Sequence, residues 1–128
     1  MLDQEWHKIA PGTRVDDVEA FERETLERVG LANPWVLPRY RSTYFSHTFA
    51  GGYDAGYYSY IFSEILDADT VEWFKENGGL TRANGDHFRA ELLSRGRTRE
   101  PLESFQAFRG RDAAIEPLLA RRGLLPQG

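Results

Sequence analysis

The residues best suited to chemistry are concentrated between Phe45 and Tyr60, in the stretch FSHTFAGGYDAGYYSY. Besides six aromatic residues, this stretch holds three glycines, one histidine and a single charged residue, Asp54. A segment that serves only as hydrophobic core favours Leu, Ile and Val, because each buried phenol must find a hydrogen-bond partner. The pattern therefore indicates a site where hydroxyl groups are presented to a polar ligand.

Tyrosine hydroxyls in such a site can act as oxyanion donors. A phenol is a neutral hydrogen-bond donor at pH 7, and it can stabilise a carbonyl oxygen that develops negative charge. The spacing from Tyr53 onward is helical and predicts one stripe, formed by Tyr53, Tyr57, Tyr60 and Glu64. Tyr53 and Tyr60 lie two turns apart, so both could address one extended substrate. The preceding Gly51 and Gly52 would let the backbone approach that substrate, or let a loop close over it.

The same residues also have a purely structural interpretation. Tyr53, Tyr57 and Tyr60 would then be half-buried contacts between helices, and His47 would be a histidine whose hydrogen bonds are satisfied at a loop. The residues alone favour this interpretation, and they support at most a binding surface lined by hydroxyl groups.

Size and composition limit the class of protein. The chain has 128 residues, which suits one domain, so residues 1–128 are predicted to form a single domain. With no cysteine there is neither a disulfide nor thiolate chemistry. No apolar stretch approaches the ~20 residues that span a bilayer, and the first residues lack the apolar core of a secretory signal. We expect a cytoplasmic protein with no membrane partner.

Charge is distributed unevenly along the chain. Residues 80–128 carry nine arginines, no lysine and six acidic residues, whereas the whole chain has a net charge of −4. A basic half could contact nucleic acid or a carboxylate ligand. Glu/Arg pairs on solvated helix faces are the favoured interpretation, and no nucleic-acid partner is predicted.

Common metal and nucleophile motifs are absent. The three histidines, His7, His47 and His87, are forty residues apart, so no zinc site of local spacing is present. The chain has no Gly-x-Ser-x-Gly elbow, and GGYDAG lacks the ending of a phosphate-binding loop. We therefore assign no metal ligand.

The elements that would position these residues are helices separated by glycine and proline. Asp16 and Asp17 are N-cap candidates for a helix that ends near Val29, and residues 33–38 (NPWVLP) form a loop. Residues 39–49 are expected to be extended or irregular. A helix begins at Tyr53, with an apolar stripe predicted to face the core, formed by Tyr58, Ile61, Phe62 and Ile65.

Further helices are bounded by caps and glycines. Residues 67–70 are interpreted as a cap between two helices, the second of which ends at residues 77–79. The remaining predicted helices are 81–94, 101–108 and 112–122, each followed by a glycine. No β-hairpin is predicted, so the fold class is all-α, an irregular multi-helix bundle.

Three stretches of the chain resemble the C-terminal part of the catalytic domain in the thimet oligopeptidase and peptidyl-dipeptidase family of zinc metallopeptidases. They are RYRSTYFSHTFAGGYDAGYYSY (39–60), WFKENGGLTRANGDHFRAELLSRGRT (73–98) and FRGRDAAIEPLLARRGL (108–124). The resemblance begins near Leu2, where LDQEWH is similar to the family's helix leading into this region. The six-residue spacing from His47 to Tyr53 is most similar to the bacterial peptidyl-dipeptidase branch.

The resemblance implies roles for individual residues. In that family a His-Glu-x-x-His helix and a later glutamate hold zinc, and the motif glutamate is the general base. Tyr53 and Tyr60 would be catalytic hydroxyl donors, one of them to the developing oxyanion. Substrate contacts near the scissile bond are implied for His47, Gly51, Gly52 and Tyr57, with the two glycines in a mobile loop.

The zinc-binding helix is missing from this chain. We therefore expect it to be the C-terminal portion of a longer mostly helical metallopeptidase domain, with zinc in the full-length enzyme and none bound to this chain alone. By itself it is expected to hydrolyse nothing. Its expected partners are short peptides, the missing N-terminal part of the peptidase, and a second copy through an exposed aromatic face at residues 53–60 or through the N-terminal helix.

Two alternatives belong to other classes. The chain could be a stand-alone helical module that binds peptides or a partner without cleaving them. It could also be a structural domain whose tyrosines only pack, although the stripe rich in hydroxyl groups disfavours this.

Overall fold

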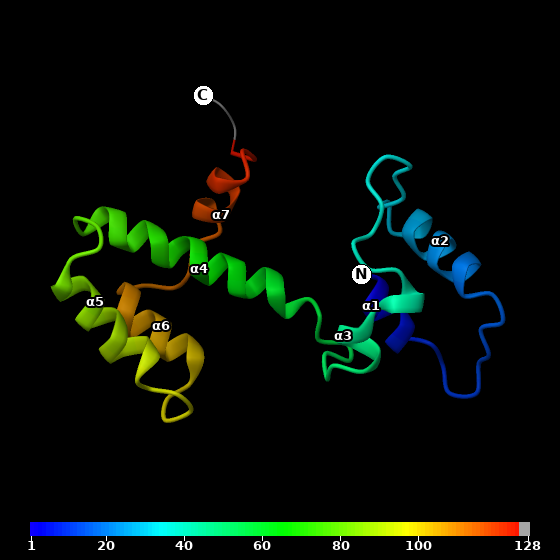
Figure 1. Ribbon diagram of the computed structural model, residues 1–128, viewed down its shortest axis with the longest axis horizontal. Coiled ribbons are helices and arrows are strands. Elements are labelled where there is room, and N and C mark those ends of the chain that lie inside the picture. Colours follow the sequence, from blue (N-terminus) through cyan, green and yellow to red (C-terminus); the bar gives the residue numbers. More distant parts are fainter. Residues whose placement is uncertain (126–128) are drawn as a thin grey trace. The chain divides into compact units, whose positions relative to one another are not determined.

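The computed structural model describes residues 1–125 of the chain (Figure 1). Within this range seven α-helices are formed and no strand is present, which confirms the all-α prediction. The helices are α1 (Leu2–His7), α2 (Val18–Arg28), α3 (Ser46–Phe49), α4 (Ser59–Glu76), α5 (Arg82–Phe88), α6 (Pro101–Arg109) and α7 (Glu116–Arg121). A 3-10 turn, η1 (Ser42–Tyr44), precedes α3, and a π-helical turn, η2 (Arg89–Leu93), continues α5.

The chain divides into two compact units. The N-terminal unit is Met1–Ser59, and the C-terminal unit begins at Tyr60. The single domain expected for residues 1–128 stays a prediction.

In the N-terminal unit, α2 begins at its predicted cap. Asp17 accepts a hydrogen bond from the Ala20 N–H at 2.9 Å, and Gly30 follows the helix with a φ of 70°. The left-handed conformation of Gly30 explains why the helix ends there, since a residue without Cβ adopts it freely.

A buried carboxylate of α2 ties that helix to the segment before α3. Glu22 accepts hydrogen bonds from the Ser42 N–H at 2.8 Å and the Ser42 hydroxyl at 3.0 Å, and it is paired with Arg41. The Ser42 hydroxyl in turn accepts from Trp6 Nε1 at 2.9 Å. The Trp6 ring packs on Phe21 at a centroid distance of 4.2 Å. Thus α1, α2 and η1 meet around one polar network covered by aromatic rings.

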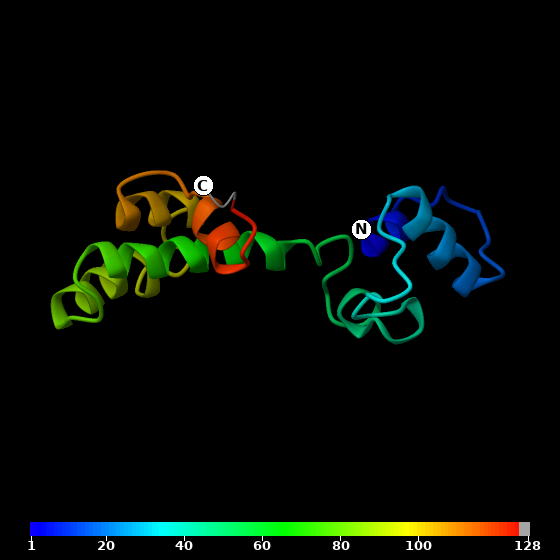
Figure 2. The ribbon, with the colours of Figure 1, turned by 90° about the horizontal axis from the view of Figure 1, so that it is seen from above.

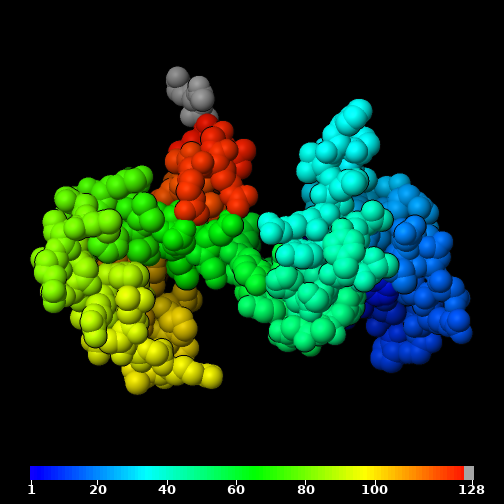
Figure 3. Space-filling view, in the orientation of Figure 1, coloured from blue at the N-terminus to red at the C-terminus, as the bar shows by residue number. Residues whose placement is uncertain are grey.

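The segment 31–49 is partly as predicted. Residues 33–38 form a loop, in which Asn33 Oδ1 accepts from the Trp35 N–H at 2.8 Å. Figure 3 shows this loop protruding from the N-terminal unit, and the Trp35 side chain is 91% exposed. Residues 39–49 were expected to be extended or irregular, whereas η1 and the short α3 lie within them.

In the C-terminal unit, α5 to α7 are gathered around the long α4 (Figures 1 and 2). Asp69 of α4 is 0% exposed and binds two arginines: Arg109 Nε at 2.8 Å and both terminal nitrogens of Arg111 at 2.7 Å. It also accepts from the Ala114 N–H at 2.9 Å. A buried charge requires such partners, so Asp69 joins α4 to the chain between α6 and α7.

An aromatic cluster forms the apolar part of this unit. The Trp73 ring lies 4.5 Å from Phe108 and 5.1 Å from His87, measured between centroids. His87 Nε2 is 3.0 Å from the Phe108 carbonyl oxygen, and the ring centroid of Phe88 lies 5.4 Å from that of Phe108. His87 is therefore a packed histidine with a polar partner.

Two predicted boundaries around α4 are wrong. Residues 53–58 form successive turns, and the helix begins at Ser59, so the tyrosine stripe expected from Tyr53 does not lie on one helix. The expected cap at residues 67–70 lies inside α4, because the carboxylate of Asp69 binds the arginines instead of capping a helix end.

Of three further predictions for this unit, one is confirmed and two are wrong. The helix expected from residue 112 begins at Glu116, since the Ala114 N–H is bonded to Asp69 outside the helix. Helix α6 matches its prediction and ends at Gly110, which has a φ of 81°. The stripe predicted to face the core is wrong: Ile61 and Phe62 are 54% and 59% exposed, Tyr58 is also exposed and Ile65 is half-buried.

Most arginines of the basic half are paired with acids. Seven of the nine in residues 80–128 take part in ion pairs, namely Arg82, Arg95, Arg99, Arg109, Arg111, Arg121 and Arg122. The i,i+4 pair of Arg82 with Asp86 is exposed, as expected for a solvated helix face, whereas Arg109 and Arg111 are paired with the buried Asp69. In the described residues, no helix combines the length and the apolar character that crossing a membrane requires.

Replacing Asp69 should destabilise the protein strongly. Asp69→Ala leaves the side chain of Arg109, which is 7% exposed, without one of its partners. Breaking a buried pair in this way costs about 3–5 kcal/mol. Asp67→Ala is a matched control on the same helix, because its pair with Arg121 is exposed and should contribute about 1 kcal/mol or less. Urea unfolding followed by circular dichroism measures both, and equal losses would contradict the assigned role.

Asp69 should also govern part of the acid sensitivity. Burial raises its pKa, but hydrogen bonds from Arg111, the Ala114 N–H and Arg109 outweigh burial, and the pKa lies below its ordinary value. The ionised carboxylate therefore stabilises the fold above the ordinary Asp pKa of about 3.9, and this stability is lost as pH falls through the folded pKa. The unfolding free energy of Asp69→Asn should fall less steeply below pH ~4 than that of the wild type. Parallel profiles would refute this.

Candidate functional site

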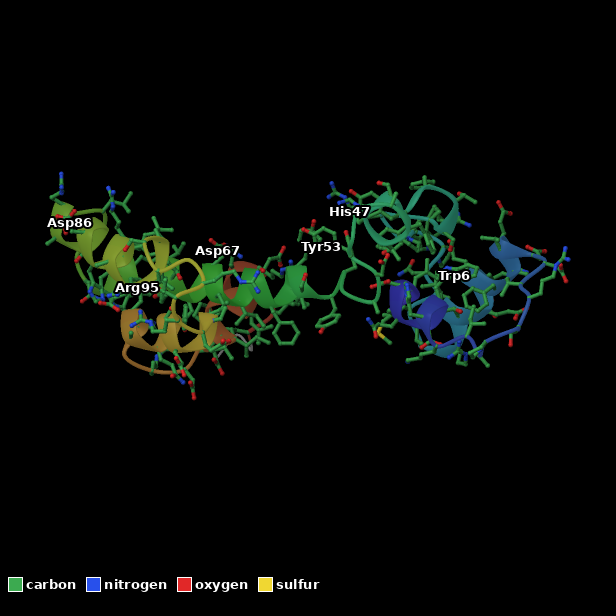
Figure 4. The ribbon with its side chains drawn as sticks, turned by 90° about the horizontal axis from the view of Figure 1, so that it is seen from below. Trp6, His47, Tyr53, Asp67, Asp86 and Arg95 are labelled. Carbon is green, nitrogen blue, oxygen red and sulfur yellow. The ribbon has the colours of Figure 1, made fainter. Side chains whose placement is uncertain are left out.

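The site segment starts in α3 and continues through a tight loop. Helix α3 ends at Ala50, and the Tyr53 N–H donates to the His47 carbonyl oxygen at 3.0 Å. This bond brings Tyr53 back toward His47, so that the two rings are neighbours (Figure 4), with centroids 6.0 Å apart and planes at 67° in an edge-to-face arrangement.

Glycine is required at positions 51 and 52 of this loop for two different structural reasons. A Cβ added to Gly51 would lie 2.9 Å from the His47 carbonyl oxygen and 3.0 Å from the His47 Cα. Cβ atoms in proteins very rarely approach other atoms so closely. Gly52 has a φ of 77°, a left-handed conformation that favours glycine. The close turn between His47 and Tyr53 therefore depends on both residues. The mobility expected of this loop stays a prediction.

The loop that follows is tied to α1. The Asp3 carboxylate accepts hydrogen bonds from the Ala55 and Tyr57 N–H groups, each at 3.0 Å. Within the loop, the Gly56 N–H donates to the Tyr53 carbonyl oxygen at 2.9 Å. Tyr57 is thus held in place by the hydrogen bond from its backbone N–H to Asp3 and by the contacts of its ring with Phe45 and His47.

An aromatic wall surrounds the imidazole of His47. It is formed by Tyr40, Phe45, Tyr53 and Tyr57. The centroid of the Tyr40 ring lies 4.8 Å from that of His47, and the centroid of Tyr57 lies 5.5 Å from it. Phe45 is buried beneath, stacked on Tyr40 at 5.3 Å. We call these four residues around His47 the aromatic wall.

A surface hollow opens in front of this wall. Its volume is about 220 Å³, and it is lined by Ser46, His47, Ala50, Gly51 and Tyr53. Three predicted site residues thus line one concave surface, with Gly52 next in the chain and Tyr57 in contact with His47. Tyr60, the other predicted catalytic residue, belongs to the C-terminal unit and to the first turn of α4.

Sequence reasoning assigned no role to two residues of this site, Tyr40 and Asp3. Tyr40 belongs to the aromatic wall, and the Arg39 Cζ lies 5.6 Å from the centroid of its ring. The hydrogen bond between Arg39 and Tyr40 raises the pKa of the guanidinium above its ordinary value. Asp3, in α1, was missed entirely, because nothing local in LDQEWH indicates a partner fifty residues away.

Chemically, the hollow offers donors rather than a reactive nucleophile. A phenol and an imidazole at its edge can bind carbonyl groups of an extended peptide or stabilise a developing oxyanion. The described residues contain no group of three His, Cys, Asp or Glu side chains that could hold a metal ion. His7 is bonded to Asp3 and His87 to the Phe108 carbonyl oxygen. The residues present therefore do not fit a zinc site.

Comparison with known proteins gives a consistent set of relatives. The profile of Peptidase family M3 matches residues 1–124. The "Dipeptidyl carboxypeptidase" proteins of Salmonella typhimurium and Escherichia coli are 44% and 43% identical over 124 residues, covering 97% of this chain. The "Probable cytosolic oligopeptidase A" of Arabidopsis thaliana is 46% identical over 129 residues. The chain spans only 18% of the length of each of these three relatives.

Alanine at Gly51 and alanine at Gly56 should change the unfolding free energy differently. Gly51→Ala forces the backbone of α3 to move and should cost about 1–3 kcal/mol of unfolding free energy. Gly56→Ala is the matched control, because its nearest neighbouring atom would lie 3.6 Å away and its φ is not left-handed. It should be neutral or stabilise slightly, by about 0.4–1 kcal/mol. Urea unfolding checks both; a neutral Gly51→Ala would mean that the turn does not need glycine.

Proposed function

The chain belongs to peptidase family M3, and from this premise we propose that it forms one wall of the peptide-binding cleft in a zinc-dependent peptidyl-dipeptidase or oligopeptidase. Membership confirms the resemblance found in residues 39–60, 73–98 and 108–124. Because the chain spans about a fifth of the length of its relatives, the activity of the whole enzyme is itself part of the proposal.

The hollow beside the aromatic wall is the observation that carries the proposal. His47, Gly51 and Tyr53 line it together, because the turn through Gly51 and Gly52 brings Tyr53 back to α3. In the proposed role, His47 hydrogen-bonds a carbonyl of the bound peptide near the scissile bond. Tyr53 donates its hydroxyl to the same stretch of peptide, and Tyr57 lines the wall behind it.

Tyr53 and Tyr60 are proposed as catalytic hydroxyl donors, one of them to the developing oxyanion. A neutral hydroxyl placed about 3 Å from the developing oxyanion lowers the energy of a tetrahedral intermediate. The Tyr53 side chain is 38% exposed beside the hollow, and that of Tyr60 is also exposed. Both therefore have a side chain that a substrate can reach.

Zinc is proposed to be bound outside this chain. The family resemblance implies zinc in the full-length enzyme, where it would polarise the attacking water. The present residues supply neither His-Glu-x-x-His nor another ligand set in residues 1–125. We therefore propose that the chain needs the metal-bearing part of the peptidase, and that it hydrolyses no peptide alone.

The second candidate is a binding module without catalysis. It is favoured by one observation: the contacts that shape the hollow all lie within the N-terminal unit. A short peptide could then be bound without any metal. For either candidate we also propose a cytoplasmic location and association of two copies, through residues 53–60 or through the N-terminal helix.

Peptide binding tests the shared part of both candidates. We expect titration of the 128-residue chain with tetra-alanine to change its tyrosine and tryptophan fluorescence. Tyr53→Phe, which removes one hydroxyl and keeps the ring, should weaken binding by about fivefold, the usual worth of one neutral hydrogen bond of ~1 kcal/mol. Tyr44→Phe is the matched control, because Tyr44 is exposed and does not line the hollow.

Three results would count against the proposal. A wild-type chain that gives no response to the peptide would favour tyrosines that only pack. An equal loss in Tyr53→Phe and Tyr44→Phe would remove the specific role of Tyr53. Peptidase activity of the pure chain that a chelator abolishes would overturn the proposed dependence on a separate zinc-bearing part.

A further inference from the structure

A buried carboxylate lies behind the aromatic wall and takes no direct part in the hollow. The side chain of Asp3, in the first turn of α1, is only 3% exposed. An ionised carboxylate is rarely withdrawn from water unless it is paired and hydrogen-bonded. Its partners therefore indicate why an acid is placed there.

The partners of Asp3 are backbone groups of the site loop. One oxygen accepts from the Ala55 N–H and the other from the Tyr57 N–H, both at 3.0 Å, across 52 and 54 residues of chain. The neighbouring Gln4 donates its side-chain amide to the Ala55 carbonyl oxygen at 2.5 Å. Helix α1 thus binds both polar groups of the Ala55 backbone.

The loop needs this support because of its conformation. Ala55 has a φ of 53°, and it is the one residue other than glycine in the described range with a positive φ. The left-handed region is unfavourable for a residue with a Cβ, so the surrounding contacts must hold it there. The hydrogen bonds from α1 are those contacts.

From this geometry we propose that Asp3 is a positioning residue for Tyr53 and Tyr57. It does not touch the substrate; it acts through the loop between the two tyrosines. Tyr57 packs its ring on Phe45 at 4.7 Å and on His47 at 5.5 Å. Releasing the Tyr57 backbone would therefore loosen the wall behind the hollow. The expected effect on peptide binding rests on the proposed function, whereas the anchoring of the loop by Asp3 does not.

A role confined to α1 is the competing explanation. An acidic residue in the first turn favours a helix N-terminus, and His7 Nδ1 lies 3.1 Å from Asp3 Oδ1. Such a role would affect the N–H groups of α1 and leave those of the loop unchanged. The two explanations therefore predict changes at different amides.

Amide hydrogen exchange on the 128-residue chain, measured by NMR, separates them. Asp3→Ala should accelerate exchange at Ala55 and Tyr57 on the order of tenfold or more, because hydrogen bonds to a charged acceptor are lost. Asp3→Asn retains one acceptor oxygen and should give an intermediate rate. Asp54→Asn is the matched control: it removes an exposed carboxylate from the same loop and should leave both amides unchanged.

Tetra-alanine titration of the same variants provides the functional readout. Affinity should decrease in the order wild type, Asp3→Asn, Asp3→Ala, with Asp54→Asn equal to wild type. Unchanged exchange at Ala55 and Tyr57 would overturn the anchoring, as would equal acceleration at every amide of the N-terminal unit. Accelerated exchange with unchanged affinity would overturn the positioning role.

The outcome also distinguishes this inference from the proposed function. If the wild-type chain binds no peptide but the exchange at Ala55 and Tyr57 follows the predicted series, the proposed function fails and the anchoring stands. If the wild type binds peptide and the series is absent, only the role of Asp3 fails.

Discussion

The cost of removing a carboxylate from water is the constraint on which this structure depends. Asp3, Glu22 and Asp69 are all buried on helices, and a buried charge is tolerated only when strong donors surround it. Each of the three finds those donors far along the chain: Asp3 in the loop after α3, Glu22 at the start of η1, and Asp69 at the end of α6 and in the segment that follows it. Short helices that could not be stable alone are thereby joined to distant segments.

This arrangement also explains how the hollow can exist on a small unit. Loops rich in glycine lose much conformational entropy when they are ordered. Here the loop from His47 to Tyr57 is closed at one end by a backbone bond to His47 and at the other by the Asp3 carboxylate. With both ends held, the loop keeps a fixed course beside the hollow, where Tyr53 is 38% exposed.

Much of the fold was predictable because it depends on neighbours in sequence. The Asp17 cap, the loop at residues 33–38 and the glycine after α6 follow from local backbone chemistry. The errors occurred where distant partners intervene. The carboxylate of Asp69 looks like a cap until its arginines are placed beside it, and residues 53–58 have helical spacing although Ala55 is left-handed.

For the candidate site, the sequence by itself determined the residue types and the family: His47, Gly51, Gly52 and the tyrosines are visible as a motif because they are close in the chain. Only the tertiary structure decided which of them share a surface. It joined His47, Gly51 and Tyr53 in one hollow, assigned Tyr60 to the other unit, and disclosed Asp3 as the anchor of the loop. The physical reason is that a hydrogen bond across fifty residues leaves no periodic trace in the sequence, whereas a cap or a left-handed glycine acts within a few residues of its partner.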